Sequence, residues 1–297
     1  MNKYRNLLIL YNSGLDFIPY FKDRGINVTR IYKKSFFPSR VFRRIFEFLN
    51  WSESYWYADW KLHLSSYKTI IVFANLHFKV LKYIIKKNPD IRIIYWYWDP
   101  VFRIGREKKW MRNIAEIWSF DPQDCIKYNL RFNTTFYFTN ILLPQNDIEY
   151  DVFFIGNDKG RVEYLQKIEH KFSKLEIKGY YHVISDKKEK GKKQVKRISY
   201  LEYLEVVSKT KTLLDILPIG QSGLTIRVME SIFFKKKLIT SDDSIVNQDF
   251  YRSENIFVLG KDNENTLLKF INSPYIELED GVMQRYEVTN WLERFNI

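Results

Sequence analysis

The chain has 297 residues, of which 45% are hydrophobic and 18% aromatic, with one cysteine and a formal net charge of +13. This length suffices for two domains, and the single cysteine, Cys125, excludes an internal disulfide and a cysteine-based zinc site. There is no uncharged apolar run of 18 residues, so we expect no membrane-spanning helix, whereas the basic charge leaves nucleic acid, an anionic membrane face and phosphorylated small molecules open as partners.

The chain begins MNKYRNLLILYNSG, a basic start followed by a short apolar run. This run is too short for the apolar core of a secretory signal, and we interpret it as a first buried strand. We therefore expect a cytoplasmic protein.

Strands and helices alternate through the first half. The expected strands are 7–11, 27–32, 68–73, 91–98, 115–120 and 134–138; the expected helices are 15–24, 39–49 and 78–87, and Asp121 can cap a further short helix. This alternation predicts a parallel, doubly wound sheet.

Residues 139–149 interrupt the alternation with Pro, Asn and Asp, and we interpret them as a linker. The expected strands after it are 151–155, 174–178, 212–217, 237–240 and 255–259; the expected helices are 161–172, 198–209, 225–234, 264–271 and 282–295. The sequence thus predicts an α/β fold with two Rossmann-like domains, 1–145 and 146–297, facing across a cleft. We expect the last helix, about 282–295, to cross back to the first domain.

One candidate binding turn is FFIGNDKGR, where a buried strand ends at Gly156 and a helix follows Gly160. A glycine at a strand end lets a ligand approach the backbone, and Lys159 and Arg161 stand at a helix start, where phosphates bind. The G-x-G-x-x-G spacing of dinucleotide sites is absent, so an ordinary strand-to-helix turn is the alternative.

A second candidate is the stretch LPIGQSGLTIRVMES, residues 217–231. Ser222 or Thr225 can cap the helix, and Gly220 and Gly223 keep the turn free of side chains. This composition indicates an anion-binding turn at a helix N-terminus.

Arg227 and Glu230 lie three residues apart on the same expected helix and share a face. The arginine suits a phosphate, and the carboxylate suits the hydroxyl pair of a sugar. A surface Arg–Glu pair without a ligand is the alternative interpretation.

The segment GQSGLTIRVMESIFFKKKLIT resembles the donor-site signature of glycosyltransferases of the GT-B fold. Within that fold it more closely resembles bacterial glycosyltransferase-like proteins of capsular and lipopolysaccharide biosynthesis, and the GNDKGR and FDPQDCIKYNLRF stretches resemble other parts of those proteins. The resemblance covers most of the chain in order, and residues 217–241 are its specific part.

This resemblance implies a transferase that moves a sugar from a UDP- or GDP-sugar to a lipid-linked or oligosaccharide acceptor of a surface polysaccharide, without a cofactor. The residues implied at the donor are Gly223, Leu224 and Thr225 at the diphosphate, Glu230 at the ribose, and Lys159 and Arg161 beside phosphate. Many members carry a second glutamate eight positions earlier, where this chain has Ser222, so the sugar contact is not assigned. No D-x-D motif ends a strand, which favours metal-independent transfer.

In the first half, Asp99 follows the buried strand in YWYWDPVFR. A carboxylate at a strand's carboxyl end could take the proton of an acceptor hydroxyl, although Asp-Pro is also a common turn. Asn12, Ser13 and Gly14 end the first strand in the same way and are candidates for the acceptor side. His77, near another strand end, is more simply a structural histidine.

The stretch FFPSRVFRRIFEFLNW predicts a basic amphipathic helix at 38–49, which either packs on the core or contacts the inner face of the bacterial plasma membrane. The lysine-rich residues 186–197 are most simply a solvated loop.

Two other functions stay open: a non-catalytic basic module for nucleic acid or anionic membrane, and a nucleotide-sugar epimerase. The glycine-containing turns favour the transferase, for which no nucleic acid partner is expected.

Overall fold

The computed structural model describes residues 3–11, 16–34, 37–49, 51–74, 78–185 and 197–297. The chain forms two compact units, Met1–Asn133 with Ile297, and Thr134–Asn296. The division thus falls before the linker, on the N-terminal side of the predicted boundary at 145/146. The predicted cleft and the crossing of the last helix stay predictions.

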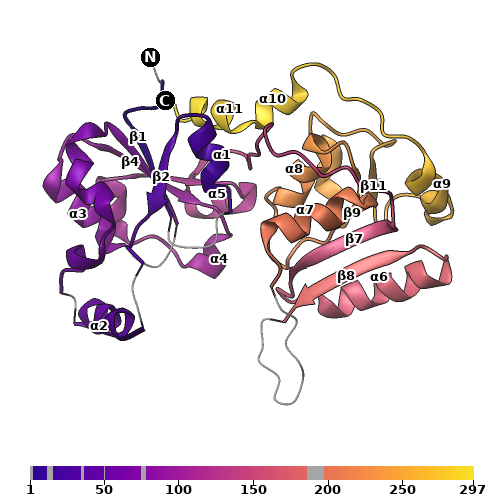
Figure 1. Ribbon diagram of the computed structural model, residues 1–297, viewed down its shortest axis with the longest axis horizontal. Coiled ribbons are helices and arrows are strands. Elements are labelled where there is room, and N and C mark those ends of the chain that lie inside the picture. The colour runs from indigo at the N-terminus through magenta and orange to yellow at the C-terminus, as the bar shows by residue number, and fades with distance from the viewer. Residues whose placement is uncertain (1–2, 12–15, 35–36, 50, 75–77, 186–196) are drawn as a thin grey trace. The chain divides into compact units, whose positions relative to one another are not determined.

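The first unit contains a six-stranded parallel sheet in the order β2-β1-β3-β4-β5-β6. Strands β1, β2 and β4 of this sheet are labelled in Figure 1. Its strands are β1 (Leu7–Tyr11), β2 (Asn27–Arg30), β3 (Thr69–Phe73), β4 (Arg92–Tyr97), β5 (Glu116–Ser119) and β6 (Arg131–Phe132). Its helices are α1 (Ile18–Asp23), α2 (Phe37–Phe48), α3 (Lys79–Lys87), α4 (Val101–Ile104) and α5 (Pro122–Tyr128), with 3₁₀ turns η1 (Ser54–Trp56), η2 (Asp59–Ser66) and η3 (Lys109–Asn113).

The central strands of this sheet are apolar on both faces, as strands covered by helices on both sides must be. All five residues of β1 are buried, and Ile9 pairs with Ile71, which pairs with Ile94. The predicted cap also forms: the Asp121 side chain accepts the amides of Gln123 and Asp124 at 3.0 and 3.1 Å.

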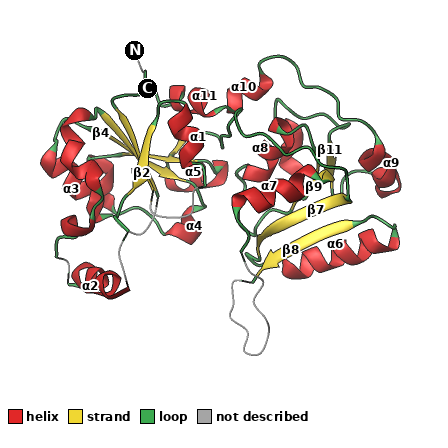
Figure 2. Cartoon of the chain, viewed as in Figure 1, coloured by secondary structure: helices red, strands yellow, loops and turns green. Residues whose placement is uncertain are grey.

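The second unit contains a five-stranded parallel sheet in the order β11-β10-β9-β7-β8. Figure 2 shows the strands of each unit gathered into a sheet with helices outside it. The strands are β7 (Tyr150–Asn157), β8 (Gly179–Ile184), β9 (Thr210–Asp215), β10 (Lys237–Thr240) and β11 (Ile256–Val258). The helices are α6 (Val162–Lys174), α7 (Tyr200–Ser208), α8 (Ile226–Phe233), α9 (Leu267–Asn272), α10 (Val282–Tyr286) and α11 (Val288–Glu293), with 3₁₀ turns η4 (Asp243–Asn247) and η5 (Glu264–Thr266).

Three predicted elements differ in the structure. The strand expected at 174–178 is wrong: α6 runs to Lys174, Glu176 takes a left-handed turn with φ of 58°, and the strand begins only at Gly179. Residues 134–138 form no strand of either sheet, although Tyr137 makes a single parallel bridge to Glu287. The helix expected at 282–295 is two helices, because Glu287 ends α10 and caps α11.

The chain order places a topological switch in the second sheet. After β7 the chain forms β8 on one side, and it then returns to form β9 on the other. Ligands of open α/β sheets bind at the carboxyl ends of the strands beside such a switch. The two candidate turns of the sequence, after β7 and after β9, both lie there.

Among the described segments, no helix combines the length and the hydropathy needed to cross a lipid bilayer.

Candidate functional site

A buried polar cluster occupies the carboxyl end of β9, centred on a residue that the sequence did not single out. Asp215 ends β9 and is fully buried. Its carboxylate accepts the hydroxyl of Thr225 at 2.8 Å and that of Thr240 at 3.3 Å, and it lies 3.8 Å from the Arg227 guanidinium. Burial raises the pKa of Asp215, while the Arg227 cation opposes that rise.

Arg227 lies inside the unit, with 7% of its surface exposed. Its Nη2 donates to the carbonyl of Ile155 in β7, and its guanidinium lies 4.8 Å from the ring centre of Phe154. A surface Arg–Glu pair is therefore excluded. The buried cation links α8 to the carboxyl end of β7.

Arg161 meets the same ring from the start of α6. Its guanidinium lies 4.9 Å from the ring centre of Phe154, and it donates to the carbonyls of Asn157, at 3.1 Å, and Ile216. With 8% exposure, it is as buried as Arg227. Two cations thus gather between the ends of β7 and β9, where the sheet topology predicts a ligand.

The start of α6 departs from the phosphate cradle expected there. The Asp158 side chain accepts the amides of Gly160, Arg161 and Val162, each at 3.1 Å. The chain's own carboxylate therefore satisfies three amides of this turn, the last of which belongs to the first residue of α6. Lys159 lies in this turn, half-buried, with a left-handed φ of 48°.

The absence of a side chain at Gly156 makes room for the Arg161 guanidinium, so a ligand is not needed to explain this glycine. A Cβ built on Gly156 would lie 2.8 Å from Arg161 Nη2, closer than real Cβ contacts. We expect Gly156→Ala to displace the guanidinium and lower the free energy of unfolding by about 1–3 kcal/mol. Chemical denaturation would measure this. In an Arg161→Ala background the same change should have little effect, and an equal loss there would show that the clash lies elsewhere.

The loop between β9 and α8 is ordered by side-chain contacts. Thr225 is the N-cap of α8 and accepts the amide of Val228 at 3.4 Å, so the cap is Thr225 and not Ser222. Gly223 and Leu224 are buried, and the Leu224 carbonyl accepts the Thr135 hydroxyl at 2.7 Å. The first turn of α8, whose amides have no intrahelical acceptor, therefore starts beside Asp215 and Arg227.

Glu230 is buried one turn further along α8, 1% exposed, in a group of tyrosines. Its carboxylate accepts the hydroxyl of Tyr203, and that of Tyr137 at 3.4 Å; the Tyr137 and Tyr200 hydroxyls are themselves hydrogen-bonded. Burial raises the pKa of Glu230 to about 7, although the tyrosine hydrogen bonds and the Arg227 charge lower it. The side chain therefore titrates near neutral pH.

The residues predicted in the first unit are partly outside the described structure. Asn12, Ser13, Gly14 and His77 lie outside the described residues. Asp99 follows β4, is half-buried and precedes Pro100, the N-cap of α4. Its place at a strand's carboxyl end agrees with the prediction, and its role as a base stays a prediction.

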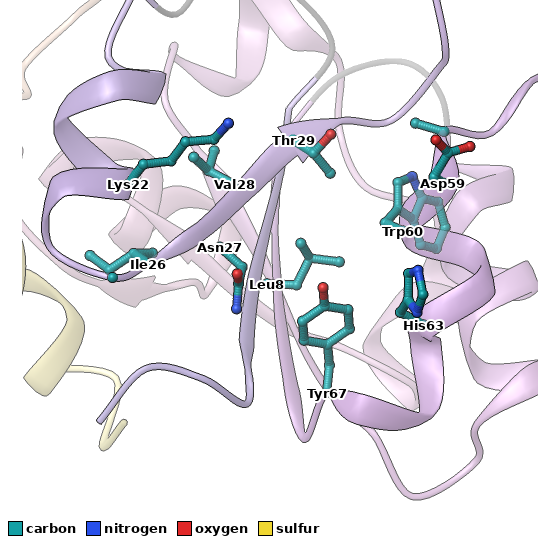
Figure 3. Close-up of a pocket in the computed structure, with 12 residues that line it drawn as sticks. Leu8, Lys22, Ile26, Asn27, Val28, Thr29, Asp59, Trp60, His63 and Tyr67 are labelled. Atoms are coloured by element: carbon teal, nitrogen blue, oxygen red, sulfur yellow. The ribbon is translucent and has the colours of Figure 1, made fainter. Parts of the chain in front are cut away.

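A pocket of about 480 Å³ opens in the first unit, and none of the candidate site residues discussed above lines it (Figure 3). Lys22 and Ile26 lie on one side of it, and Asp59, Trp60 and His63 on the other. It lies beside the amino-terminal ends of β1 and β2, whereas ligands of parallel sheets bind at the carboxyl ends. We therefore do not assign the reaction to this pocket.

Comparison with known proteins gives distant similarities in fold. No protein-family model matches the sequence, and no curated protein matches it. A glycosyltransferase from Rickettsia africae aligns at 8% identity over 97% of this chain and 88% of that chain, with a TM-score of 0.38. An NADPH-dependent glyoxylate/hydroxypyruvate reductase from Sinorhizobium meliloti, in complex with citrate, aligns at 12% identity over 96% and 89%, with a TM-score of 0.22. Both are too distant to carry an argument about function.

Proposed function

We propose that this chain is a glycosyltransferase that binds a nucleotide-diphosphate sugar, UDP- or GDP-linked, at the switch point of its second sheet. The observation that carries the proposal is the pair of buried arginines, Arg161 and Arg227, beside the first turn of α8. Arg227 lies within the segment 217–241 that resembles a donor-site signature, and Arg161 donates to the carbonyl of Ile216, the residue directly before that segment.

The proposed chemistry is electrostatic. When the glycosidic bond breaks, negative charge grows on the diphosphate, and charges fixed in a water-poor site stabilise it most strongly. The carbonyls of Ile155, Asn157 and Ile216 hold both guanidinium groups in place before any ligand arrives. The α8 N-terminus adds its dipole, with Gly223, Leu224 and Thr225 beside the diphosphate.

Glu230 has the proposed role of holding the ribose. In the structure its two oxygens accept hydroxyls from Tyr137 and Tyr203. Ribose hydroxyls are donors of the same kind, so a bound nucleotide would replace tyrosine hydroxyls at this carboxylate. Asp99 is proposed as the base that takes the acceptor's proton, with Asn12, Ser13 and Gly14 on the acceptor side. The proposed acceptor is a lipid-linked or oligosaccharide precursor of a surface polysaccharide, on the cytoplasmic side of the membrane.

Nucleotide titration by calorimetry tests the donor site directly. We expect UDP or GDP to bind and the matching nucleoside, without phosphate, to bind far more weakly. Since Lys159, Arg161 and Arg227 supply the positive charge, affinity should be equal in EDTA and in Mg²⁺. Binding that requires Mg²⁺ would contradict this site, and tight, salt-sensitive binding to DNA alone would favour the nucleic acid module.

Two lysines in the same left-handed backbone conformation, Lys159 and Lys235, allow a matched test of positive charge at the proposed site. Lys159→Asn removes the charge at a left-handed position that asparagine tolerates, and should weaken UDP or GDP binding about tenfold or more. Lys235→Asn makes the same change at another left-handed position, φ 53°, beyond the far end of α8, and should leave affinity unchanged. Equal effects of the two variants would argue against a phosphate at Lys159.

An epimerase would also bind these nucleotides. It would convert the donor sugar without an acceptor, which NMR of the incubated nucleotide sugar detects. We expect no such conversion.

A further inference from the structure

The helix α2 contacts the rest of its unit through a narrow face. The Ser39 hydroxyl accepts Trp56 Nε1 at 2.9 Å, Arg43 lies 3.9 Å over the Tyr32 ring, and Phe46 packs edge-on against Trp56 at 5.1 Å. These three positions, i, i+4 and i+7, form one stripe of a helix. They are the half-buried side chains among those described in α2.

A second face of α2 is apolar and exposed. Phe48 is 88% exposed and Phe42 is 59% exposed. The exposed apolar residues of this face are Val41, Phe42, Ile45, Phe48 and Leu49, spaced i, i+1, i+4, i+7 and i+8. This spacing is that of a helix face that is normally buried, and Trp51 and Tyr55, 55% and 67% exposed, follow it in the chain. A contiguous group of exposed large apolar side chains marks a contact surface.

Positive charge borders this face. Arg40 and Arg44 are exposed on the remaining side of α2, and Lys33 and Lys34 are exposed before the helix. Lys33 also lies 3.9 Å from the Tyr55 ring. A second copy of the chain meeting this face would bring like charges together, whereas an anionic surface would neutralise them.

We propose that the α2 surface, Arg40, Val41, Phe42, Arg44, Ile45, Phe48 and Leu49, docks in the interface of an anionic lipid bilayer. The apolar face lies among the lipid chains near the headgroups, and the arginines meet the lipid phosphates. Trp51 and Tyr55 have the amphipathic rings that prefer this depth. The proposal rests on α2 and its neighbours alone and is independent of the nucleotide site.

Sedimentation with vesicles tests the charge and the apolar face separately. The full chain should sediment with phosphatidylglycerol vesicles at low salt, sediment poorly with phosphatidylcholine, and be released at high salt. Arg40→Gln with Arg44→Gln should lower vesicle affinity roughly 30-fold. Arg43 is left unchanged because it packs on Tyr32. The matched control is Lys86→Gln with Lys87→Gln, two exposed positions on α3, which removes the same charge and should lower vesicle affinity less than the two arginine changes do.

The apolar test uses Phe42→Ser with Phe48→Ser, which should abolish sedimentation without changing the melting temperature, because both rings are exposed. Leu62→Ser, at a site 70% exposed on η2, should bind as the parent does. The proposal would be overturned if Leu62→Ser lowered vesicle binding as much as Phe42→Ser with Phe48→Ser does, or if the parent did not bind vesicles. A dimer in light scattering, without lipid, that the Phe42 and Phe48 changes dissociate would also overturn it. Calorimetry of UDP or GDP binding on the same variants should show no change, which separates this proposal from the donor site.

Discussion

Replacing Arg227 with methionine should lower the free energy of unfolding by about 3–5 kcal/mol, because it leaves the buried Asp215 carboxylate without its closest cation. Methionine keeps much of the apolar stem that packs in α8. The change removes the 3.8 Å ion pair with Asp215 and the hydrogen bond to Ile155. Chemical denaturation monitored by circular dichroism measures the loss.

A double-mutant cycle assigns that loss to the pair. Asp215→Asn keeps the size of the side chain and an acceptor for the Thr225 hydroxyl, and it removes the charge. Combined with Arg227→Met it should recover part of the stability, giving a coupling energy of about 1–3 kcal/mol. The matched control is Arg252→Met, which breaks an exposed pair with Glu279 and should cost under about 1 kcal/mol. Additive losses from the two buried changes would contradict a direct pair.

Most of both sheets could be predicted because their strands are buried on both faces. The sequences of β1 and β4 are short, nearly continuous apolar runs, and a buried strand is the simplest interpretation of such a run. The edge strand β8 was missed because its sequence, GYYHVI, is interrupted by histidine and begins with glycine, so it is not a continuous apolar run; in the structure all six residues are half-buried. The run 174–178 was mistaken for it because Leu175 and Ile177 are apolar, although they belong to the turn after α6.

The site was predictable in position but not in its contacts. Both strand-to-helix turns carry glycine and cations, and the rule for parallel sheets places them at one edge. The partner of Arg227, the Ile155 carbonyl, lies 72 residues away in the chain, so no local pattern reveals it. Asp158 could have been recognised, because aspartate side chains commonly accept backbone amides of the turn that follows them. That interpretation would have predicted that the amides of the turn before α6 already have an acceptor.

For α2, the sequence predicted an amphipathic helix but not which way its apolar face points. Either burial or exposure of Phe42 and Phe48 fits the same spacing. The structure decides through Trp56, whose indole binds Ser39 and packs on Phe46, and so turns the stripe of Ser39, Arg43 and Phe46 inward.

Glu230 should make the protein less stable as the pH rises from about 4.5 to about 7. Its pKa is about 7 in the folded chain and has its ordinary value of 4.5 in the unfolded chain. Over this range the folded state holds a proton that the unfolded state has lost, so raising the pH favours unfolding. The full effect is about 3 kcal/mol and is complete above pH 7. Glu230→Gln removes this contribution, so its stability advantage over the parent should grow from pH 5 to pH 8, and Glu169→Gln, at an exposed site on α6, should show no such trend.

The same titration bears on the proposed ribose contact. An ionised carboxylate accepts hydroxyl donors more strongly than a protonated one, so donor affinity should increase as the pH rises through about 7. A UDP- or GDP-hexose is the suitable probe, because its diphosphate does not titrate in this range. In Glu230→Gln the affinity should be lower at pH 8 by roughly 1.5–3 kcal/mol and should no longer change with pH. If calorimetry gives the same affinity and the same pH profile for parent and variant, Glu230 serves the tyrosine cluster alone, and the nucleotide is held elsewhere.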